Sequence, residues 1–287
     1  MSIPEDLLRE KIKGFLEEDI GLGDITTEII VPSEIKVRAH IIVKEPAVIA
    51  GLNEAKIAFE VVGPKFLPKV REGDEVPAGA IIAMVEGYGR NILLAERTAL
   101  NILSRMCGVA TETRNLIRKV TEAGFNVRIA ATRKTAPGLR YFDKRAVIIG
   151  GGDPHRFRLD DQILIKDNHV VIAGNLEEAL KRAISSASFS KKIEVEVKTV
   201  DDAIKAARLG ADIIMLDNMS VDNVRKVIES LLELGLRDKV LIEVSGEITK
   251  DNILEYARLG PDIISVGAIT HSVKSIDMSL EIIEVER

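Results

Sequence analysis

Two adjacent cations, Arg133 and Lys134, come shortly after the apolar run VRIA at 127–130. Side-by-side positive charges repel each other, and each is costly to remove from water unless an anion shares its site. The whole chain is acidic, with 45 Asp and Glu residues against 40 Lys and Arg residues, so this pair is a local exception. It predicts a ligand with carboxylates or phosphates, which Arg forks and Lys point charges bind.

A second group of cations lies in the loop GGGDPHRFRLDD at 150–161, which contains His155 and Arg156. Between Arg133 and Lys166, eight Lys or Arg residues stand against four Asp residues, so the inferred ligand is strongly anionic. A single loop histidine is more often a capping residue than a catalytic one. Only its neighbour Arg156 therefore favours placing His155 in the binding site.

Several other strand-like runs also end in polar or small residues, namely Lys166, Glu196, Lys198, Asp217, Ser245, Gly246 and Gly267. Ligands of parallel α/β folds bind at the carboxyl ends of the strands, so these residues predict one shared site. Glu196 and Asp217 offer oxygen ligands that suit a divalent metal held together with a phosphate substrate. The alternative is that both carboxylates are structural ion-pair partners of Lys166 or Lys198.

Alternation along the strands adds ionisable groups to one face of the sheet. In IEVEVK at 193–198, Glu194, Glu196 and Lys198 share a face, while the aliphatic residues share the other. Glu243 shares a face with Ser245 in the same way. A purely structural barrel fills its interior with branched aliphatic residues, so these polar faces favour a site.

The elements that must position these residues follow a regular order. Six apolar strand-like runs alternate with amphipathic helical patterns between about 126 and 268, as in VDDAIKAARLG followed by ADIIMLDN. This alternation predicts βα units with a parallel sheet, arranged as a small, incomplete α/β barrel. An open doubly wound sheet is the alternative.

The first hundred residues have a different pattern. KVRAHIIVKEPAVIAG indicates strands and turns, EAKIAFEVVG a helix, and VREGDEVPAGAIIAMVEG a hairpin. RNILLAERTALNILSRMCG is an amphipathic helix whose polar stripe contains Arg97, Asn101 and Arg105. We therefore predict an α+β domain at about 1–106.

Composition excludes several classes of protein. No window approaches the run of about 20 apolar residues that spans a membrane, and the first residues lack the pattern of a signal peptide. The single cysteine, Cys107, cannot form an internal disulfide. The net charge of −5 and the absence of Trp give no support to nucleic-acid binding. We expect a cytoplasmic protein with no membrane or nucleic-acid partner.

Taken in order, the motifs TRKT, HR, IKDNH, EVEV, LDN and SG resemble those of the quinolinate phosphoribosyltransferase family, also called nicotinate-nucleotide pyrophosphorylase (carboxylating). The likeness runs from EDIGLGDITTE through ERTALNILSRMCGVAT to ISVGAITHS. It implies phosphoribosyl transfer from phosphoribosyl pyrophosphate to quinolinate with decarboxylation, in NAD biosynthesis, with Mg²⁺ as cofactor.

The resemblance also implies an N-terminal α+β sandwich-like domain followed by an incomplete α/β (TIM-like) barrel. We expect the first domain at 1–106 and the catalytic barrel at 107–269, with 270–287 returning to the first domain. Members of the family form dimers or hexamers in which one subunit's N-terminal domain covers the other's barrel mouth. A homo-oligomer is therefore expected, with Arg97 of ERTALN reaching the neighbouring active site.

Matched motif by motif, the resemblance implies three groups of site residues. The quinolinate-binding group is Arg97, Arg133, His155 and Arg156. Lys134 and Lys166 would contact the phosphoribosyl donor or the reacting carboxylate, and Glu196 and Asp217 would bind the ribose hydroxyls and Mg²⁺. The 5′-phosphate group is Ser245, Gly246 and Gly267. One position departs from the family's usual SGG: Glu247 follows Gly246, and its carboxylate would repel a phosphate unless it points away.

Two other functions remain open on the sequence, and a third, a carrier domain, does not. Nicotinate phosphoribosyltransferase has a related fold, but nicotinate has one carboxylate and needs fewer cations. A barrel lyase could use Lys166 to form a Schiff base. The stretch at 70–87 resembles the hairpin of biotinyl and lipoyl carrier domains, but no lysine follows it closely.

Overall fold

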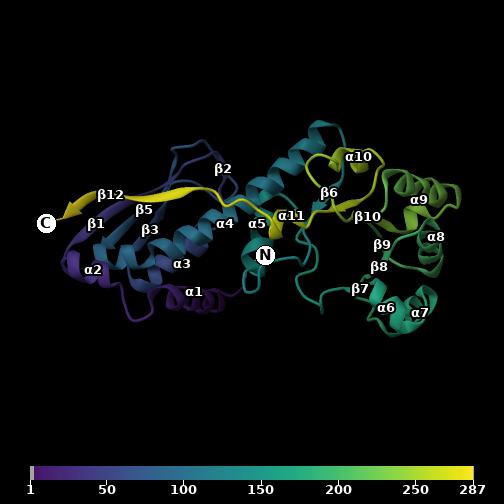
Figure 1. Ribbon diagram of the computed structural model, residues 1–287, viewed down its shortest axis with the longest axis horizontal. Coiled ribbons are helices and arrows are strands. Elements are labelled where there is room, and N and C mark those ends of the chain that lie inside the picture. Colours follow the sequence, from purple (N-terminus) through teal and green to yellow (C-terminus); the bar gives the residue numbers. More distant parts are fainter. Residues whose placement is uncertain (1–2, 287) are drawn as a thin grey trace. The chain divides into compact units, whose positions relative to one another are not determined.

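The computed structural model describes residues 3–286, which divide into two compact units (Figure 1). Unit 1 contains the described residues through Arg114, the segment Tyr141–Gly151 and the chain from Val273 onward. Unit 2 contains Asn115–Arg140 and Gly152–Ser272. Unit 1 is therefore built from three separate segments of the chain.

A four-stranded antiparallel sheet forms the centre of unit 1, in the order β12-β1-β5-β3. The strands are β1 (Lys36–Val43), β3 (Lys65–Pro68), β5 (Ile81–Tyr88) and β12 (Met278–Glu286). Alternate residues of β1, namely Val37, Ala39, Ile41 and Val43, are buried, as expected for a strand with one face on the core. The helices of this unit are α1 (Glu5–Ile20), α2 (Ile25–Ile30), α3 (Leu52–Val62), α5 (Arg140–Gly150) and most of α4 (Gly89–Glu122).

The hairpin predicted at 70–87 is wrong. The short strand β4 (Glu75–Val76) pairs with β2 (Ala47–Val48), whereas β5 pairs with β1 and β3. A turn does lie between β4 and β5, as the glycine there predicts. Gly79 in this turn has φ +83°, and its N–H donates to the carbonyl of Val43. The eight-residue apolar strand β5 instead pairs with β1, which has the same length.

Helix α4 is longer than predicted, because it continues past Gly108 for another fourteen residues to Glu122. The apolar positions of its amphipathic pattern are buried, namely Ile92, Ala95, Ala99, Ile102, Leu103 and Met106. A glycine in a helix interior usually weakens it, but here a Cβ at Gly108 would lie 2.2 Å from the backbone oxygen of Lys274. Gly108 therefore allows the C-terminal segment to cross the helix closely.

Unit 2 contains a six-stranded parallel sheet in the order β6-β11-β10-β9-β8-β7. The strands are β6 (Arg128–Ala130), β7 (Ile163–Ile165), β8 (Ile193–Val197), β9 (Ile213–Asp217), β10 (Leu241–Ser245) and β11 (Ile263–Ser265). All six predicted strands are present, and β6 and β7 form the two edges of this sheet. The predicted fold class, an α/β chain with an N-terminal α+β domain and an incomplete α/β barrel, is confirmed.

The helices of unit 2 follow the strands along the chain. They are α6 (Asp167–Ala173), α7 (Leu176–Ser186), α8 (Val200–Leu209), α9 (Val221–Glu233), η1 (Arg237–Lys239), α10 (Ile253–Ala257) and α11 (Ala268–His271). Helix α8 shows why the predicted boundaries hold: the Thr199 side chain accepts the N–H of Asp202 at its start, and Gly210 ends it with φ +96°.

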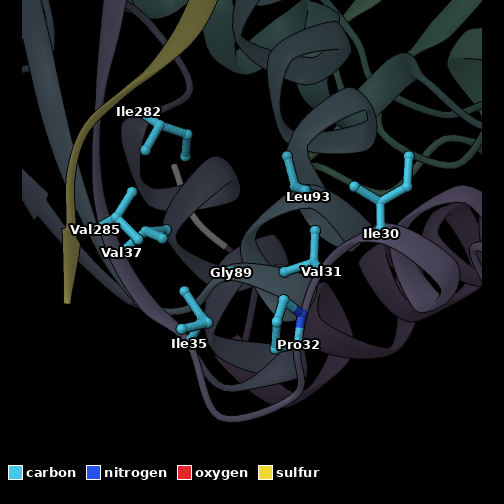
Figure 2. A pocket seen from close by; sticks show the side chains of 9 residues that line it. All are labelled: Ile30, Val31, Pro32, Ile35, Val37, Gly89, Leu93, Ile282 and Val285. Carbon is cyan, nitrogen blue, oxygen red and sulfur yellow. The ribbon is translucent and has the colours of Figure 1, made fainter. Parts of the chain in front are cut away.

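Unit 1 carries an apolar pocket of about 360 Å³ (Figure 2). It is lined by Ile30, Val31, Pro32, Ile35, Val37, Gly89, Leu93, Ile282 and Val285. None of these side chains can pair with an anion, so this pocket is not the site that the sequence predicts. Within residues 3–286, we find no helix with the length and apolar character needed to span a membrane.

Candidate active site

The carboxyl ends of the parallel strands bring the predicted site residues of unit 2 to one edge of the sheet. Asp217, the last residue of β9, lies directly opposite Ser245, the last residue of β10. Glu196 pairs in register with Met215 on β9, two residues before Asp217. The two predicted metal ligands thus come from neighbouring strands, as their positions in the sequence indicate.

Lys166, which follows β7, forms an ion pair with Glu196 on the neighbouring strand β8, with Nζ 2.6 Å from Oε2. The Glu196 side chain is only 9% exposed, whereas that of Lys166 is 45% exposed. Lys198 pairs instead with Asp167 at 3.1 Å, and this hydrogen bond lowers the pKa of Asp167. The sequence left open that Glu196 is an ion-pair partner of Lys166 or Lys198, and the pair with Lys166 is present. This pair places a cation beside the proposed metal ligand Glu196.

The turns after β9 and β10 fit closely together. Asn218 has φ +53°, and its backbone N–H donates to the carbonyl of Ser245. Gly246 has φ +95°, and a Cβ there would lie 2.3 Å from Asn218 Oδ1, so no larger residue fits. Glu247 follows with φ +46° and an exposed side chain. The predicted phosphate-binding turn at Ser245 and Gly246 is thus held in place by its contacts with Asn218.

Lys134 lies beside Gly267, at the start of α11. Its Cδ would be 3.3 Å from a Cβ at Gly267, and its carbonyl accepts the Thr270 hydroxyl at 2.7 Å. Gly267 therefore leaves room for the Lys134 side chain. The structure thus brings Lys134 together with Gly267, which the family resemblance places in the 5′-phosphate group.

Arg133 and Arg156 form the cationic part of the site. Arg156 is 9% exposed, and burial together with the charge of Arg133 lowers its pKa. The Nε of Arg133 is buried and has no hydrogen-bond partner among the described residues. Two neighbouring guanidinium groups, one with an unsatisfied donor, suit a ligand that carries more than one negative charge.

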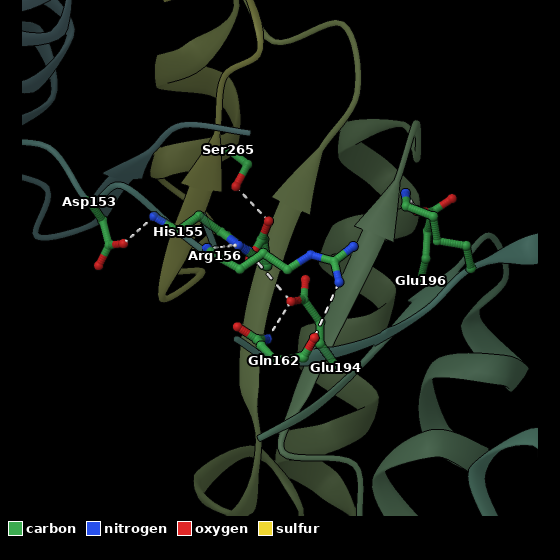
Figure 3. Close-up of polar contacts among 9 residues, drawn as sticks. Asp153, His155, Arg156, Gln162, Glu194, Glu196 and Ser265 are labelled. Atoms are coloured by element: carbon green, nitrogen blue, oxygen red, sulfur yellow. Dashed lines mark hydrogen bonds and ion pairs between the residues drawn. The ribbon is translucent and has the colours of Figure 1, made fainter. Parts of the chain in front are cut away.

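His155 lies within the barrel, where its Nε2 is 3.1 Å from Glu243 Oε2 and 3.5 Å from Glu194 Oε2 (Figure 3). Both glutamates are fully buried. Burial tends to lower the pKa of His155, but the hydrogen bonds and charges of the two glutamates outweigh it and raise this pKa above its ordinary value. The histidine and the two carboxylates thus form a buried network.

The backbone N–H of Arg156 donates to Nδ1 of His155 at 2.8 Å. A doubly protonated imidazole would lose this hydrogen bond, because its second proton would sit on Nδ1 and face the amide hydrogen. This contact therefore requires a ring whose single proton lies on Nε2. The amide of Arg156 disfavours a second proton on Nδ1, whereas the charges of the two carboxylates favour it.

The site prediction omitted Glu194 and Glu243, which the structure brings together with His155. Burial raises the pKa of Glu194, and Gln162 donates to its Oε2 at 2.6 Å. Ser265 donates to Glu243 Oε1 at 2.5 Å. Strand alternation already placed both glutamates on the interior face, and that signal could have identified them.

Arg97 is the one predicted site residue that belongs to unit 1. It lies on α4 with a side chain that is 61% exposed, 3.8 Å from Glu96 Oε1. The other long cation of the same stripe, Arg105, instead makes a two-pronged ion pair with buried Asp143 on α5, at 2.7 and 2.9 Å. The stripe therefore contains one structural arginine and one exposed one.

Two family models match nearly the whole chain. The model described as quinolinate phosphoribosyl transferase, N-terminal domain, matches residues 24–107. The model of the C-terminal domain of the same enzyme matches residues 109–281.

Relatives match over similar lengths. A probable nicotinate-nucleotide pyrophosphorylase (carboxylating) from Methanothermobacter thermautotrophicus is 46% identical over 277 residues, which cover 96% of this chain and 98% of the relative. A mitochondrial quinolinate phosphoribosyltransferase (decarboxylating) from Nicotiana tabacum is 38% identical, covering 96% of this chain and 82% of its own length. The solved structure of nicotinate-nucleotide pyrophosphorylase from Francisella tularensis superposes with a TM-score of 0.91 at 36% identity, covering 98% of each chain.

Proposed function

The chain belongs to the quinolinate phosphoribosyltransferase family, and on that premise we propose that it makes nicotinate mononucleotide for NAD biosynthesis. The reaction transfers phosphoribosyl from phosphoribosyl pyrophosphate to quinolinate and releases CO₂ and pyrophosphate. One observation on this chain supports the proposal independently of the family. The neighbouring cations Arg133 and Arg156 are costly to hold in a partly buried site unless a multiply charged anion such as quinolinate binds there.

Quinolinate would bind at the arginine pair. Each carboxylate of the diacid can accept two parallel N–H bonds from a guanidinium group, which fixes the plane of the pyridine ring. We assign Arg133 and Arg156 to this role, with His155 lining the site and Arg97 supplied by a second subunit. Lys166 would balance the charge of the reacting carboxylate while it stays paired with Glu196.

Phosphoribosyl pyrophosphate would bind along the strand ends. Ser245 and Gly246 lie in a turn that can present a hydroxyl and backbone N–H groups to the 5′-phosphate, together with Gly267. Lys134, next to Gly267, would contact the donor. Glu196 and Asp217 supply two carboxylates on adjacent strands, which fits a Mg²⁺ ion that also binds waters and substrate phosphates. When bound, Mg²⁺ would offset negative charge on the pyrophosphate.

The protein's part in the chemistry is to position groups and to offset charge. The bond from C1′ to pyrophosphate breaks with its electron pair leaving on oxygen, and the pyridine nitrogen of quinolinate donates a pair to C1′. Lys134 would stabilise the negative charge that develops on the leaving group. The positively charged ring then accepts the electrons of the bond to the 2-carboxylate, CO₂ leaves, and the ring carbon takes up a proton.

We also propose a homo-oligomer. Helix α2 exposes Ile25, Ile29 and Ile30 by 74%, 78% and 71%, which is unusual for large aliphatic side chains on one short helix. Contiguous apolar surface of this kind commonly marks a protein interface. A dimer or a hexamer is compatible with this surface. A reducing compartment such as the cytoplasm stays our expectation, because the one cysteine, Cys107, is buried and unpaired.

The test is a paired assay with phosphoribosyl pyrophosphate and Mg²⁺, in which quinolinate and nicotinate are supplied separately. We expect nicotinate mononucleotide and CO₂ to appear together in equal amounts with quinolinate only. Chelation of the metal should abolish this product, as the control for the proposed cofactor. Turnover of nicotinate without CO₂ would contradict the proposal and assign the chain to salvage instead.

A further inference from the structure

Both ring nitrogens of His155 are engaged within unit 2. An ionised carboxylate can only accept a hydrogen bond, so Nε2 carries the proton that faces Glu243 Oε2 at 3.1 Å. The lone pair then lies on Nδ1, where the backbone N–H of Arg156 donates to it at 2.8 Å. The carboxylates thereby select the tautomer that holds the backbone of Arg156.

The carboxylates are themselves fixed by donors from the barrel. Ser265 on β11 donates to Glu243 Oε1 at 2.5 Å, which leaves Oε2 to face His155 at 3.1 Å. Gln162 donates to Glu194 Oε2 at 2.6 Å. Glu194 and Glu243 come from β8 and β10, which are separated by β9, so the imidazole bridges two strands of a rigid sheet.

The loop at 153–156 depends on this bridge. His155 adopts φ +52°, a left-handed conformation that is unfavourable for a residue with a side chain and needs support from its surroundings. Its N–H donates to Asp153 Oδ1 at 2.7 Å. Further along, the Arg156 guanidinium donates to the carbonyl of Gln162 at 3.2 Å. Arg156 is therefore held at its backbone by His155 and at its tip by the loop.

We propose that Glu243, acting through His155, is a positioning residue that sets the place of Arg156 for binding the diacid. The proposal rests on the proposed function, in which Arg156 binds quinolinate. Glu243 makes no contact with the substrate in this role. Its charge and its fixed oxygen determine which nitrogen of His155 is protonated, and that nitrogen determines whether the Arg156 amide has a partner.

A divalent cation is the other occupant that these groups suggest, since ligand atoms of His155, Glu194 and Glu243 lie within 4.8 Å of one another. A cation on Nε2 would need the lone pair there. With Nδ1 also accepting from Arg156, the ring would have to be a fully deprotonated imidazolate, which is a demanding state. A proton on Nε2 satisfies the same contacts at no such cost.

The test compares Glu243→Gln with the charge-matched control Glu255→Gln, an exposed position on α10 of the same unit. Because Ser265 donates to Oε1, the new amide nitrogen would face His155 Nε2 and favour the opposite tautomer. We expect the KM for quinolinate to rise about tenfold and the KM for phosphoribosyl pyrophosphate to stay nearly unchanged. Ser265→Ala, a milder change, should raise the quinolinate KM in the same direction if Glu243→Gln does not fold.

The tautomer is measured independently of activity. Long-range ¹⁵N spectra of the four histidines at neutral pH, with the His155→Gln variant for assignment, report the protonation of each ring nitrogen. We expect an unprotonated Nδ1 in the wild-type protein and in Glu255→Gln, and its protonation in Glu243→Gln.

A protonated Nδ1 in the wild-type protein would overturn the proposal. So would an unchanged quinolinate KM in folded Glu243→Gln, or an equal rise in both KM values, which a merely structural role would give. If the wild-type protein does not turn over quinolinate, the proposed function fails, while the tautomer spectra still decide whether Glu243 controls His155.

Discussion

At the scale of single residues, Glu247 combines two unfavourable features. Its φ of +46° lies in the left-handed region, which costs a residue with a Cβ about 1–2 kcal/mol. Its carboxylate also follows directly after the turn that we assign to the 5′-phosphate. The exposed side chain can point away from that turn, but the backbone cost remains.

We predict that Glu247→Gly stabilises the protein and improves donor binding. Glycine removes the left-handed cost, and after its own entropic penalty the net gain is about 0.5–1 kcal/mol in the free energy of unfolding. Loss of the carboxylate should lower the KM for phosphoribosyl pyrophosphate. Urea unfolding and steady-state kinetics measure the two effects.

The matched control is Glu247→Ala, which removes the charge but keeps the Cβ. It should lower the donor KM as Glu247→Gly does, without the gain in stability. A donor KM that is unchanged in both variants would show that the carboxylate points away from the phosphate.

The residues at the strand ends could be predicted from the sequence because their place depends only on the strand that carries them. Glu196 and Asp217 are of this kind. The partnership of His155 with Glu243 joins residues 88 positions apart and depends on the left-handed turn at His155. Neither composition nor periodicity contains that information, so the network became visible only in the structure.

At the scale of elements, two helical glycines show opposite surroundings. A Cβ at Gly108 on α4 would lie 2.2 Å from the Lys274 carbonyl, whereas a Cβ at Gly14 on α1 would meet nothing within 4 Å. The segment at 274–276 also bonds to α4 directly, since Ile276 N–H donates to the carbonyl of Ser104. One glycine is thus required by packing, and the other is free to change.

We predict that Gly108→Ala destabilises unit 1 by about 1–3 kcal/mol, because the backbone at Lys274 must move away from the new methyl group. Gly14→Ala should stabilise the protein by about 0.5–1 kcal/mol through helix propensity. Thermal unfolding followed by circular dichroism measures both. Equal stabilisation by the two substitutions would mean that the crossing at Gly108 is looser than described.

Periodicity predicted the six strands of unit 2 because each is short, apolar and followed by a helix with a clear start. It predicted that α4 is a helix but not how long it is. Gly108 resembles the glycine that usually ends a helix, although α4 continues to Glu122. It misjudged the partner of β5, because pairing with β1 or with β4 leaves the same alternation in the sequence.

At the scale of the whole molecule, the exposed apolar side chains of α2 lie next to the apolar pocket of Figure 2. Ile30 belongs to both. A second copy that covers this surface would remove large aliphatic groups from water, which favours association. The site residue Arg97 is carried by the same unit as this surface.

We predict that two inactive variants restore activity when they are mixed. Arg97→Ala should lack the arginine that it supplies to its neighbour, and Arg133→Ala should lack its own substrate arginine. After unfolding and refolding together, a mixed dimer has one complete site, so about a quarter of the wild-type activity should return for equal amounts of the two chains. No recovery, with mixed oligomers confirmed by mass, would place Arg97 outside the neighbouring site.

The pairing of β12 with β1 joins an early and a late segment of the sequence in one sheet. During synthesis on a ribosome, residues 36–43 emerge early but must wait for residues 278–286 before this edge of the sheet is complete. Unit 2, which lies between them in the sequence, is released first and can fold as a domain while unit 1 is still open. The nine residues of β12 thus determine when the sheet of unit 1 is complete, and a chain that stalls before them would leave the hydrogen-bonding edge of β1 unpaired.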